Sequence, residues 1–484
     1  MINLQIVKIL RSFTKEEINS FTDFIYSPYY NKSKTVQKLW DEVKKYAPEF
    51  DSPNLEKEKV FKKIFGDKNF NYGTMKNLIS TFTSIAEKFL ELKYYESEKF
   101  QCDYNSLASM IIKYLPESFN KKYKKVYTDY EDTKEGDDFH FLNKYMLMRL
   151  HTSLSGLQSK MDYTIFREGE ALISFFFVHL FQVHHNIISF LFTKGATEEN
   201  NLVEKFIGSL NMEKILDDIK AVQPKHYEVI NLYYHINLCR KNPDNDKHFF
   251  EFKKLMLNGP RVLGKNDFKN LTDCYFNVLS ERSLRGIQGT KKETAEFVKF
   301  CINEKVEWGN TEKHLAINTF ASIISKLLIA NDFENAELCY KKYSKMILKE
   351  DKKNIENLYN AFYSYSEKKF DKALEYASKI RSETPMIKFY VKGLETKSHY
   401  EVSPSDIFSY SINAYRQMIY RFEAVEERKD FAKNYLNAMS ALYEYREFGR
   451  GNLDDIKFEV MKNKMLSKEW ILEKIEELEE KNNK

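Results

Sequence analysis

The fold is decided by a pattern that occurs twice, in Asn331-Asp-Phe-Glu-Asn-Ala-Glu-Leu-Cys-Tyr340 and in Lys369-Phe-Asp-Lys-Ala-Leu-Glu-Tyr376. In both copies a phenylalanine stands three residues before an alanine, just after a short polar turn. The small alanine lets two helices approach closely, and the aromatic ring fills the joint between them. The two alanines are 37 residues apart, which is the period of a repeat made of two helices. The pattern therefore predicts paired antiparallel helices in this part of the chain.

The composition of the whole 484-residue chain agrees with a fold made of helices. The 15 Gly and 9 Pro residues make up about 5% of the chain, against about 12% in an average protein. β-Sandwiches and doubly wound nucleotide-binding folds need these residues in turns and phosphate loops. A hydrophobic content of 43% also excludes intrinsic disorder. We therefore predict an all-α fold of stacked antiparallel helix pairs, an α-solenoid with an N-terminal helical domain.

The two copies resemble tetratricopeptide repeats. The matching positions of the first copy are Phe320, Ile323, Leu327, Phe333, Ala336 and Tyr340. Those of the second copy are Phe370, Ala373 and Pro385, whereas Asn357 and Asn360 depart from the family pattern. The overall layout also resembles uncharacterised bacterial all-helical proteins that carry an element like Ser27-Pro-Tyr-Tyr-Asn31. Both resemblances imply architecture, and the first implies a protein-binding surface.

Charge and turn signals divide the chain into three regions. Lys121–Lys125 precede an acidic block that runs to Asp138, so we place a boundary near residue 135. We expect an N-terminal helical domain over residues 1–135 and a middle region of candidate degenerate repeats over 136–310. Residues 311–484 then hold the tetratricopeptide-like repeats and a closing C-terminal helix. Within the middle region we expect helix breaks at Pro224, Pro243 and Asn258-Gly-Pro260.

The chain has the features of a cytoplasmic protein. Its five cysteines are scattered without a CxxC pair, and Met1–Arg11 does not read as a signal peptide. One segment, residues 171–192, has no charged side chain and is long enough to span a bilayer. Ser, His, Gln and Asn residues interrupt it, so we interpret it as a central helix buried among others, with membrane association as the alternative.

No catalytic, cofactor-binding or metal-binding residue is predicted. Gly259-Pro-Arg-Val-Leu-Gly-Lys-Asn266 has the glycine and lysine spacing of a phosphate-binding loop. However, Asn266 replaces the Ser or Thr that would bind magnesium, and the preceding residues have helical periodicity, so we predict an interhelical loop. His179, His184 and His185 do not share one helix face, which favours core histidines over metal ligands.

The sequence therefore predicts a non-enzymatic scaffold or adaptor that binds a protein or peptide on its repeats. The candidate binding face consists of Asn318, Ala321, Ser325, Leu328, Phe362 and Tyr365. The near balance of 76 basic and 71 acidic residues argues against a nucleic-acid partner. Two alternatives stay open. One is a nucleic-acid-contacting regulator that uses Lys57, Lys59, Lys62, Lys63 and Lys121–Lys125. The other is an enzyme of unrecognised type built around His179–His185.

Overall fold

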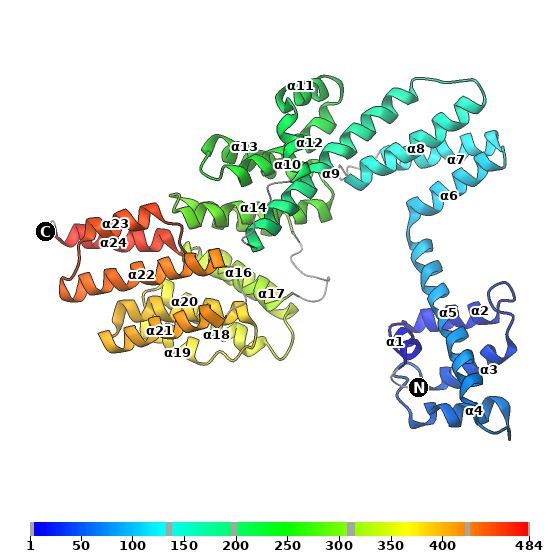
Figure 1. Ribbon diagram of the computed structural model, residues 1–484, viewed down its shortest axis with the longest axis horizontal. Coiled ribbons are helices and arrows are strands. Elements are labelled where there is room, and N and C mark those ends of the chain that lie inside the picture. Colours follow the sequence, from blue (N-terminus) through cyan, green and yellow to red (C-terminus); the bar gives the residue numbers. More distant parts are fainter. Residues whose placement is uncertain (1–3, 132–137, 195–200, 307–314, 422–425, 483–484) are drawn as a thin grey trace. The chain divides into compact units, whose positions relative to one another are not determined.

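The computed structural model describes residues 4–131, 138–194, 201–306, 315–421 and 426–482 (Figure 1). Within these ranges the chain forms helices joined by short turns, and no strand is present. The predicted all-α class is thus confirmed. The chain divides into two compact units, Met1–Tyr127 with Leu150–Met161, and Thr128–Arg149 with Asp162–Lys484.

The first unit is built on an aromatic core that includes Phe21, Trp40 and Phe82, all fully buried. Its second helix begins at a capping box: the Glu17 N–H donates to the Thr14 hydroxyl, and the Thr14 N–H donates to the Glu17 carboxylate. Its elements are α1 (Gln5–Arg11), α2 (Lys15–Tyr26), α3 (Lys34–Val43), η1 (Lys44–Tyr46), η2 (Pro53–Leu55), α4 (Lys57–Phe65), α5 (Tyr72–Ser97), α6 (Lys99–Ile112) and most of α7 (Pro116–Glu131).

The second unit contains the remaining helices. The middle region supplies α8 (Asp138–Leu157, whose end belongs to the first unit), α9 (Thr164–Lys194), α10 (Leu202–Ser209), α11 (Met212–Val222), α12 (Pro224–Lys241), α13 (Asp246–Val262), α14 (Lys265–Arg285) and α15 (Thr290–Asn303). The C-terminal region supplies α16 (Ile317–Ile329), α17 (Phe333–Tyr343), η3 (Ser344–Met346), α18 (Lys352–Ser366), α19 (Phe370–Ser378), α20 (Pro385–Val402), α21 (Ser405–Arg421), α22 (Glu426–Phe448), α23 (Leu453–Lys462) and α24 (Lys468–Asn482).

Helices that follow one another in sequence pack against one another in this unit, from α11 to α13 and from α18 to α22 (Figure 1). One hydrophobic core extends from Phe141 to Leu394, and a second from Tyr400 to Leu478. The predicted boundaries near residues 135 and 310 both lie outside the described residues. The first core continues on both sides of residue 310, because α15 packs against α16.

The repeated Phe/Ala pattern occupies helix–helix joints. Ala336 and Ala373 are fully buried. The Phe333 ring meets Tyr363 of α18 edge-on at 5.2 Å between ring centroids, and the Phe370 ring meets Tyr365 at 5.5 Å. These contacts are the ones that the small and aromatic residues of the pattern predict.

The C-terminal helix α24 packs against α14 as well as against α22 and α23. The Met465 N–H donates to the Leu284 carbonyl at 3.1 Å, and Lys464 forms an ion pair with the buried Glu281 at 2.8 Å. The closing helix therefore contacts the middle region in addition to its neighbours in sequence.

The break expected at Asn258-Gly-Pro260 is wrong, because α13 continues to Val262 with Pro260 in its last turn. The ring of Phe268, on α14, packs against α13 at Gly259. A Cβ atom at position 259 would stand 2.7 Å from Cε2 of that ring. The glycine thus allows close helix packing and does not form a phosphate loop.

We expect Gly259→Ala to lower the free energy of unfolding by about 1–2 kcal/mol. The Phe268 ring is buried and must shift to admit a methyl group, and this cost exceeds the roughly 1 kcal/mol that alanine gains over glycine in a helix. Gly208→Ala, where a Cβ meets nothing within 4 Å, is the matched control and should be neutral or stabilising. Chemical unfolding of both variants measures the difference. Equal effects at the two positions would refute the packing role of Gly259.

Candidate functional site

The residues of the predicted binding face lie inside the second unit. Ala321, Ser325 and Leu328 of α16 are buried, as is Phe362 of α18, while Asn318 and Tyr365 are partly buried. Helices α18 and α20 both pack against α16 and cover this face. The six side chains have the burial of packing residues, so they offer little surface to a peptide.

The chain's own C-terminal segment contacts α18 and α20 through single side chains. Tyr365 lies close to Trp470 at the start of α24. The Trp470 ring also meets the Tyr400 ring at 5.2 Å, and Lys397 donates to the Ser467 hydroxyl at 2.9 Å. Burial among these groups lowers the pKa of Lys397 to about 7. An external ligand would therefore have to displace a tryptophan to reach Tyr365.

The histidines of α9 do not share one face of the helix, as their spacing predicts. His184 and His185 are buried against α12 and α14, whereas His179 is exposed. The Nδ1 atom of His184 lies 2.8 Å from the Asn237 side-chain oxygen, and its Nε2 atom lies 2.5 Å from the Glu204 carboxylate. Both ring nitrogens thus have protein partners. Among the described residues no group of three His, Cys, Asp or Glu side chains could hold a metal ion.

His185 and Cys274 form a close pair, with 3.2 Å between Nε2 and Sγ. Burial, together with the neighbouring Arg240 and His184, lowers the pKa of His185 to about 4. Burial raises the pKa of the Cys274 thiol to about 12. A nucleophilic cysteine needs the opposite shifts, a thiolate beside a protonated histidine. The pair is therefore neutral near pH 7 and lacks the activation of a catalytic dyad.

Several lysines of the first unit are paired with acids or aromatic rings. Lys59 lies 3.0 Å from Glu56, and Lys122 lies 3.1 Å from Asp103. Lys63 forms an ion pair with Glu42, and Lys57 stands over the Tyr72 ring. The three carboxylate partners offset the charge of Lys59, Lys63 and Lys122, and so reduce the positive charge that a nucleic-acid surface requires.

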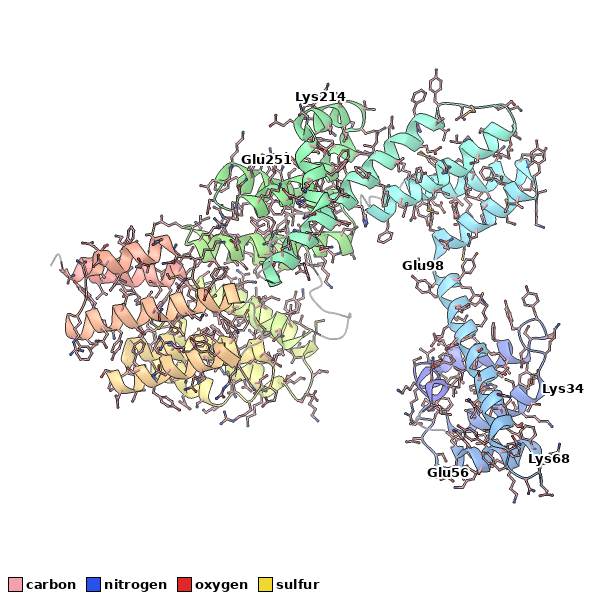
Figure 2. The ribbon with its side chains drawn as sticks, viewed as in Figure 1. Lys34, Glu56, Lys68, Glu98, Lys214 and Glu251 are labelled. Atoms are coloured by element: carbon pink, nitrogen blue, oxygen red, sulfur yellow. The ribbon has the colours of Figure 1, made fainter. Side chains whose placement is uncertain are left out.

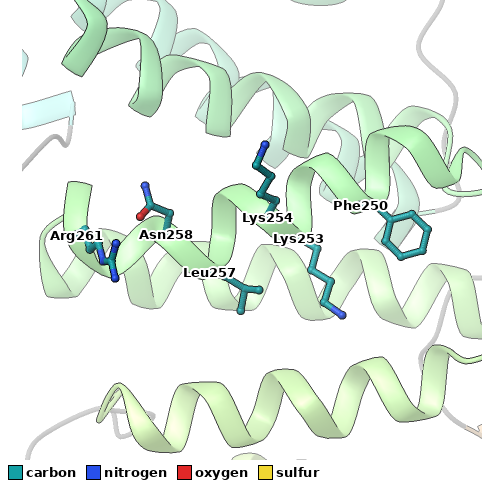
Figure 3. Close-up of a pocket in the computed structure, with 6 residues that line it drawn as sticks. All are labelled: Phe250, Lys253, Lys254, Leu257, Asn258 and Arg261. Carbon is teal, nitrogen blue, oxygen red and sulfur yellow. The ribbon is translucent and has the colours of Figure 1, made fainter.

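A shallow hollow of about 380 Å³ lies along the outer face of α13, in the second unit (Figure 3). The opposite face of α13 holds Phe249, Phe252 and Met256 in the core. The hollow combines apolar, cationic and amide side chains and is lined by Phe250, Lys253, Lys254, Leu257, Asn258 and Arg261. Phe250 is 55% exposed and Leu257 is 45% exposed, so their apolar surface is available to a ligand.

The three cations of the hollow differ in how much charge they present to solvent. Lys253 forms ion pairs with Glu293 and Glu296 of α15, the latter at 3.4 Å. Lys254 makes one loose contact, at 3.8 Å, with Glu251, which is labelled on α13 in Figure 2. Within the part of the chain that the structure describes, Arg261 has no ion-pair partner. Lys254, whose side chain is 78% exposed despite its contact with Glu251, and Arg261 are therefore the two charges most accessible to an anionic partner.

The spacing along the helix gives the hollow a repeat. Phe250 and Leu257 are seven residues apart, as are Lys254 and Arg261, which corresponds to two turns or about 10.5 Å. The sequence did contain a signal for this face: of the adjacent Phe249 and Phe250, only one can lie on the buried side of a helix. Because the pattern predicts a loop from Gly259 onward, Arg261 falls outside the predicted helix, and its spacing from Lys254 does not stand out in the sequence.

Segment 259–266 ends α13 and begins α14, so it does not join a strand to a helix. Comparison of the chain with protein-family models, with curated proteins and with solved structures gives no match. The geometry of the hollow is therefore the basis for assigning a function.

Proposed function

We propose that the protein is a non-enzymatic scaffold or adaptor that binds a protein partner through the outer face of α13. The observation that carries this proposal is the hollow itself, in which two exposed apolar side chains alternate with two solvent-facing cations at the same heptad spacing. A partner helix with one apolar and one acidic residue in each heptad matches this surface. Its apolar side chains would contact Phe250 and Leu257, and its carboxylates would reach Lys254 and Arg261.

The chemistry of the hollow favours recognition over catalysis. Its polar groups are lysine, arginine and asparagine, and it has no acid, thiol or histidine to transfer a proton or attack a substrate. Arg261 can bind a carboxylate through two parallel hydrogen bonds, which gives orientation as well as affinity. The apolar pair supplies the desolvated contact at the centre of the interface.

Charge reversal in the hollow should abolish binding of an acidic amphipathic helix. The probe is a labelled two-heptad peptide with one leucine and one glutamate in each heptad, followed by fluorescence anisotropy. We expect Lys254→Glu with Arg261→Glu to weaken binding by at least about tenfold. We also expect the wild-type affinity to fall with added salt, because both cations are exposed.

Two controls separate the hollow from general electrostatics. Lys352→Glu with Lys353→Glu changes the net charge equally at an exposed site on α18 and should leave binding unchanged. A peptide of the same composition with scrambled order should bind weakly, because its leucines no longer match the spacing of Phe250 and Leu257. Equal binding by both peptides, or an equal loss in both double variants, would refute the proposal.

A further inference from the structure

Helix α9 has two apolar faces, of which one is buried and the other is only partly covered within the described structure. The first face, which includes Val178, Phe181 and His184, is buried against α12. The second face lies about 125° around the helix, at 100° per residue. It is formed by Phe166, Gly169, Ile173, Phe176, Leu180, Val183, Ile187 and Phe190, which we call the α9 stripe.

The α9 stripe follows an unbroken heptad pattern. Its members succeed one another at alternating spacings of three and four residues over three and a half heptads. This spacing produces the seam of a left-handed pair of helices, because 3.5 residues per turn keep the seam facing a partner. The stripe is roughly 36 Å long at 1.5 Å per residue, so it matches a partner helix of similar length.

The ends of the stripe are the most exposed. Phe166 is 66% exposed and Phe190 58%, while Ile173 and Phe176 are 48% and 42% exposed. Leu180, Val183 and Ile187, in the middle, are partly covered, and Phe206 of α10 lies beside Phe176 at 5.8 Å between ring centroids. Isolated exposed apolar residues are normal in proteins, but several exposed large apolar side chains aligned on one helix face indicate an interface.

The charges on α9 favour a second copy of this chain over a lipid surface. Helices that lie in a membrane interface carry Lys or Arg on their polar face, and α9 has neither between Arg167 and Lys194. The positions that flank the stripe on its exposed side, Leu172, His179 and Asn186, carry no acid, Lys or Arg. Two identical stripes can therefore meet without repulsion between carboxylates or between lysines.

The exposed area reaches the lower limit for a specific pair of identical stripes. A large apolar side chain buries about 150–250 Å² when it is fully covered. Six partly exposed side chains contribute to the surface here: Phe166, Ile173, Phe176, Phe190 and the neighbouring Ile165 and Leu172. Their exposed parts amount to roughly 500 Å². Two copies together would bury about 1,000 Å², which is the lower limit for a specific interface. We infer that the protein forms a homodimer in which the α9 stripes of two copies pack as a helix pair.

The same helix is long and apolar enough to cross a membrane, by length and composition, over Thr164–Leu191. Only 39% of its most apolar window is buried. Self-association accounts for the exposed remainder without requiring His184, His185 and Ser174 to leave their hydrogen-bonded partners. Membrane insertion would break these contacts and place the polar groups in lipid.

Sedimentation equilibrium of the full chain tests the inference. Across micromolar concentrations we expect a mass of twice 57.7 kDa. Ile173→Glu with Phe176→Glu should weaken the dimer at least about 100-fold, because it places four like charges in an apolar seam. Ile173 and Phe176 are 48% and 42% exposed in one copy, and Phe176 meets the Phe206 ring, so helix content should stay unchanged and the melting temperature should fall only slightly. A wild-type monomer at all concentrations would overturn the inference.

Two further measurements make the outcome specific to the stripe. Leu338→Glu with Phe458→Glu changes comparably exposed residues on α17 and α23, which are 53% and 64% exposed, and should leave the dimer intact. If this control dissociates the dimer equally, the α9 stripe is not the interface. Flotation with phosphatidylcholine vesicles, with and without phosphatidylserine, should leave the protein in the bottom fraction. Flotation that is lost in the Ile173→Glu, Phe176→Glu variant would overturn the inference in favour of a lipid surface.

Discussion

Acidification from pH 7 to pH 4.5 should destabilise the second unit by several kcal/mol. Burial lowers the pKa of three of its histidines, His185, His226 and His235, to about 4 in each case. For His226 the neighbouring Lys144, His140 and Lys225 charges act in the same direction. In the unfolded chain the imidazoles have an ordinary pKa near 6.5. Between about pH 6.5 and pH 4 the unfolded state therefore binds protons at these rings that the folded state does not bind.

The sign of the effect follows from this difference. Above about pH 6.5 these rings are neutral in both states, and their contribution to folding is constant. As the pH falls from about 6.5 to 4, the unfolded state takes up protons first, so the free energy of unfolding decreases by roughly 1.4 kcal/mol per pH unit for each ring. The total decrease in the free energy of unfolding is roughly 3 kcal/mol per ring, and it is reached near pH 4.

Melting temperatures measured between pH 7.5 and pH 4.5 test this expectation. His226→Gln removes one of the three groups and should make the melting temperature less dependent on pH, even if the variant is less stable at pH 7.5 because it alters the 2.8 Å contact with Ser174. Asn186→Gln, at an exposed position of α9 without a titratable group, should leave the pH dependence unchanged. A constant melting temperature across this range would contradict the burial of the three rings.

The second large effect is expected at Arg282, near the end of α14. This side chain is 4% exposed, and it donates to the Pro243 carbonyl at 2.5 Å and to Asp246 at 2.6 Å. Its guanidinium also stacks over the Phe249 ring, 4.1 Å from the centroid. One residue therefore fixes the turn between α12 and α13 and the start of the helix that carries the hollow.

We expect Arg282→Met to lower the free energy of unfolding by about 2–4 kcal/mol, because it leaves a carbonyl unpaired and removes the stacked cation. Arg282→Lys should recover only part of this loss, since an ammonium group cannot make both hydrogen bonds and stack. Arg450→Met is the matched control. Arg450 is 74% exposed and pairs with the exposed Glu444, so we expect an effect within about 1 kcal/mol. Similar losses at both positions, measured by urea unfolding, would argue against the role given to Arg282.

The fold class was predictable because its signals are local. The capping box at Thr14 and the N-terminal prolines of α12 and α20 act within one or two helical turns, and the structure contains all three. The repeated Phe/Ala pattern likewise predicted the buried Ala336 and Ala373. Proline was a poor guide only at Pro260, where a helix tolerates it in its last turn.

The location of the candidate site depended on contacts that the local pattern does not contain. Whether Tyr365 is open to a ligand depends on Trp470, which lies on a helix more than a hundred residues later in the chain. The pairing of Lys397 with Ser467, 70 residues away, is of the same kind. An apolar residue on an inner helix face predicts burial against something, but the sequence does not say whether that partner is a ligand or the protein itself.

The central claim is that the outer face of α13 holds a protein partner, and crosslinking at that face tests it most directly. A photo-crosslinking residue is introduced at Leu257, or as a control at the similarly exposed Leu338, in cells that naturally make the protein. We expect a discrete protein adduct from position 257 only, which disappears when Lys254→Glu and Arg261→Glu are added. No adduct at position 257, or the same adducts at both positions, would contradict the proposed function.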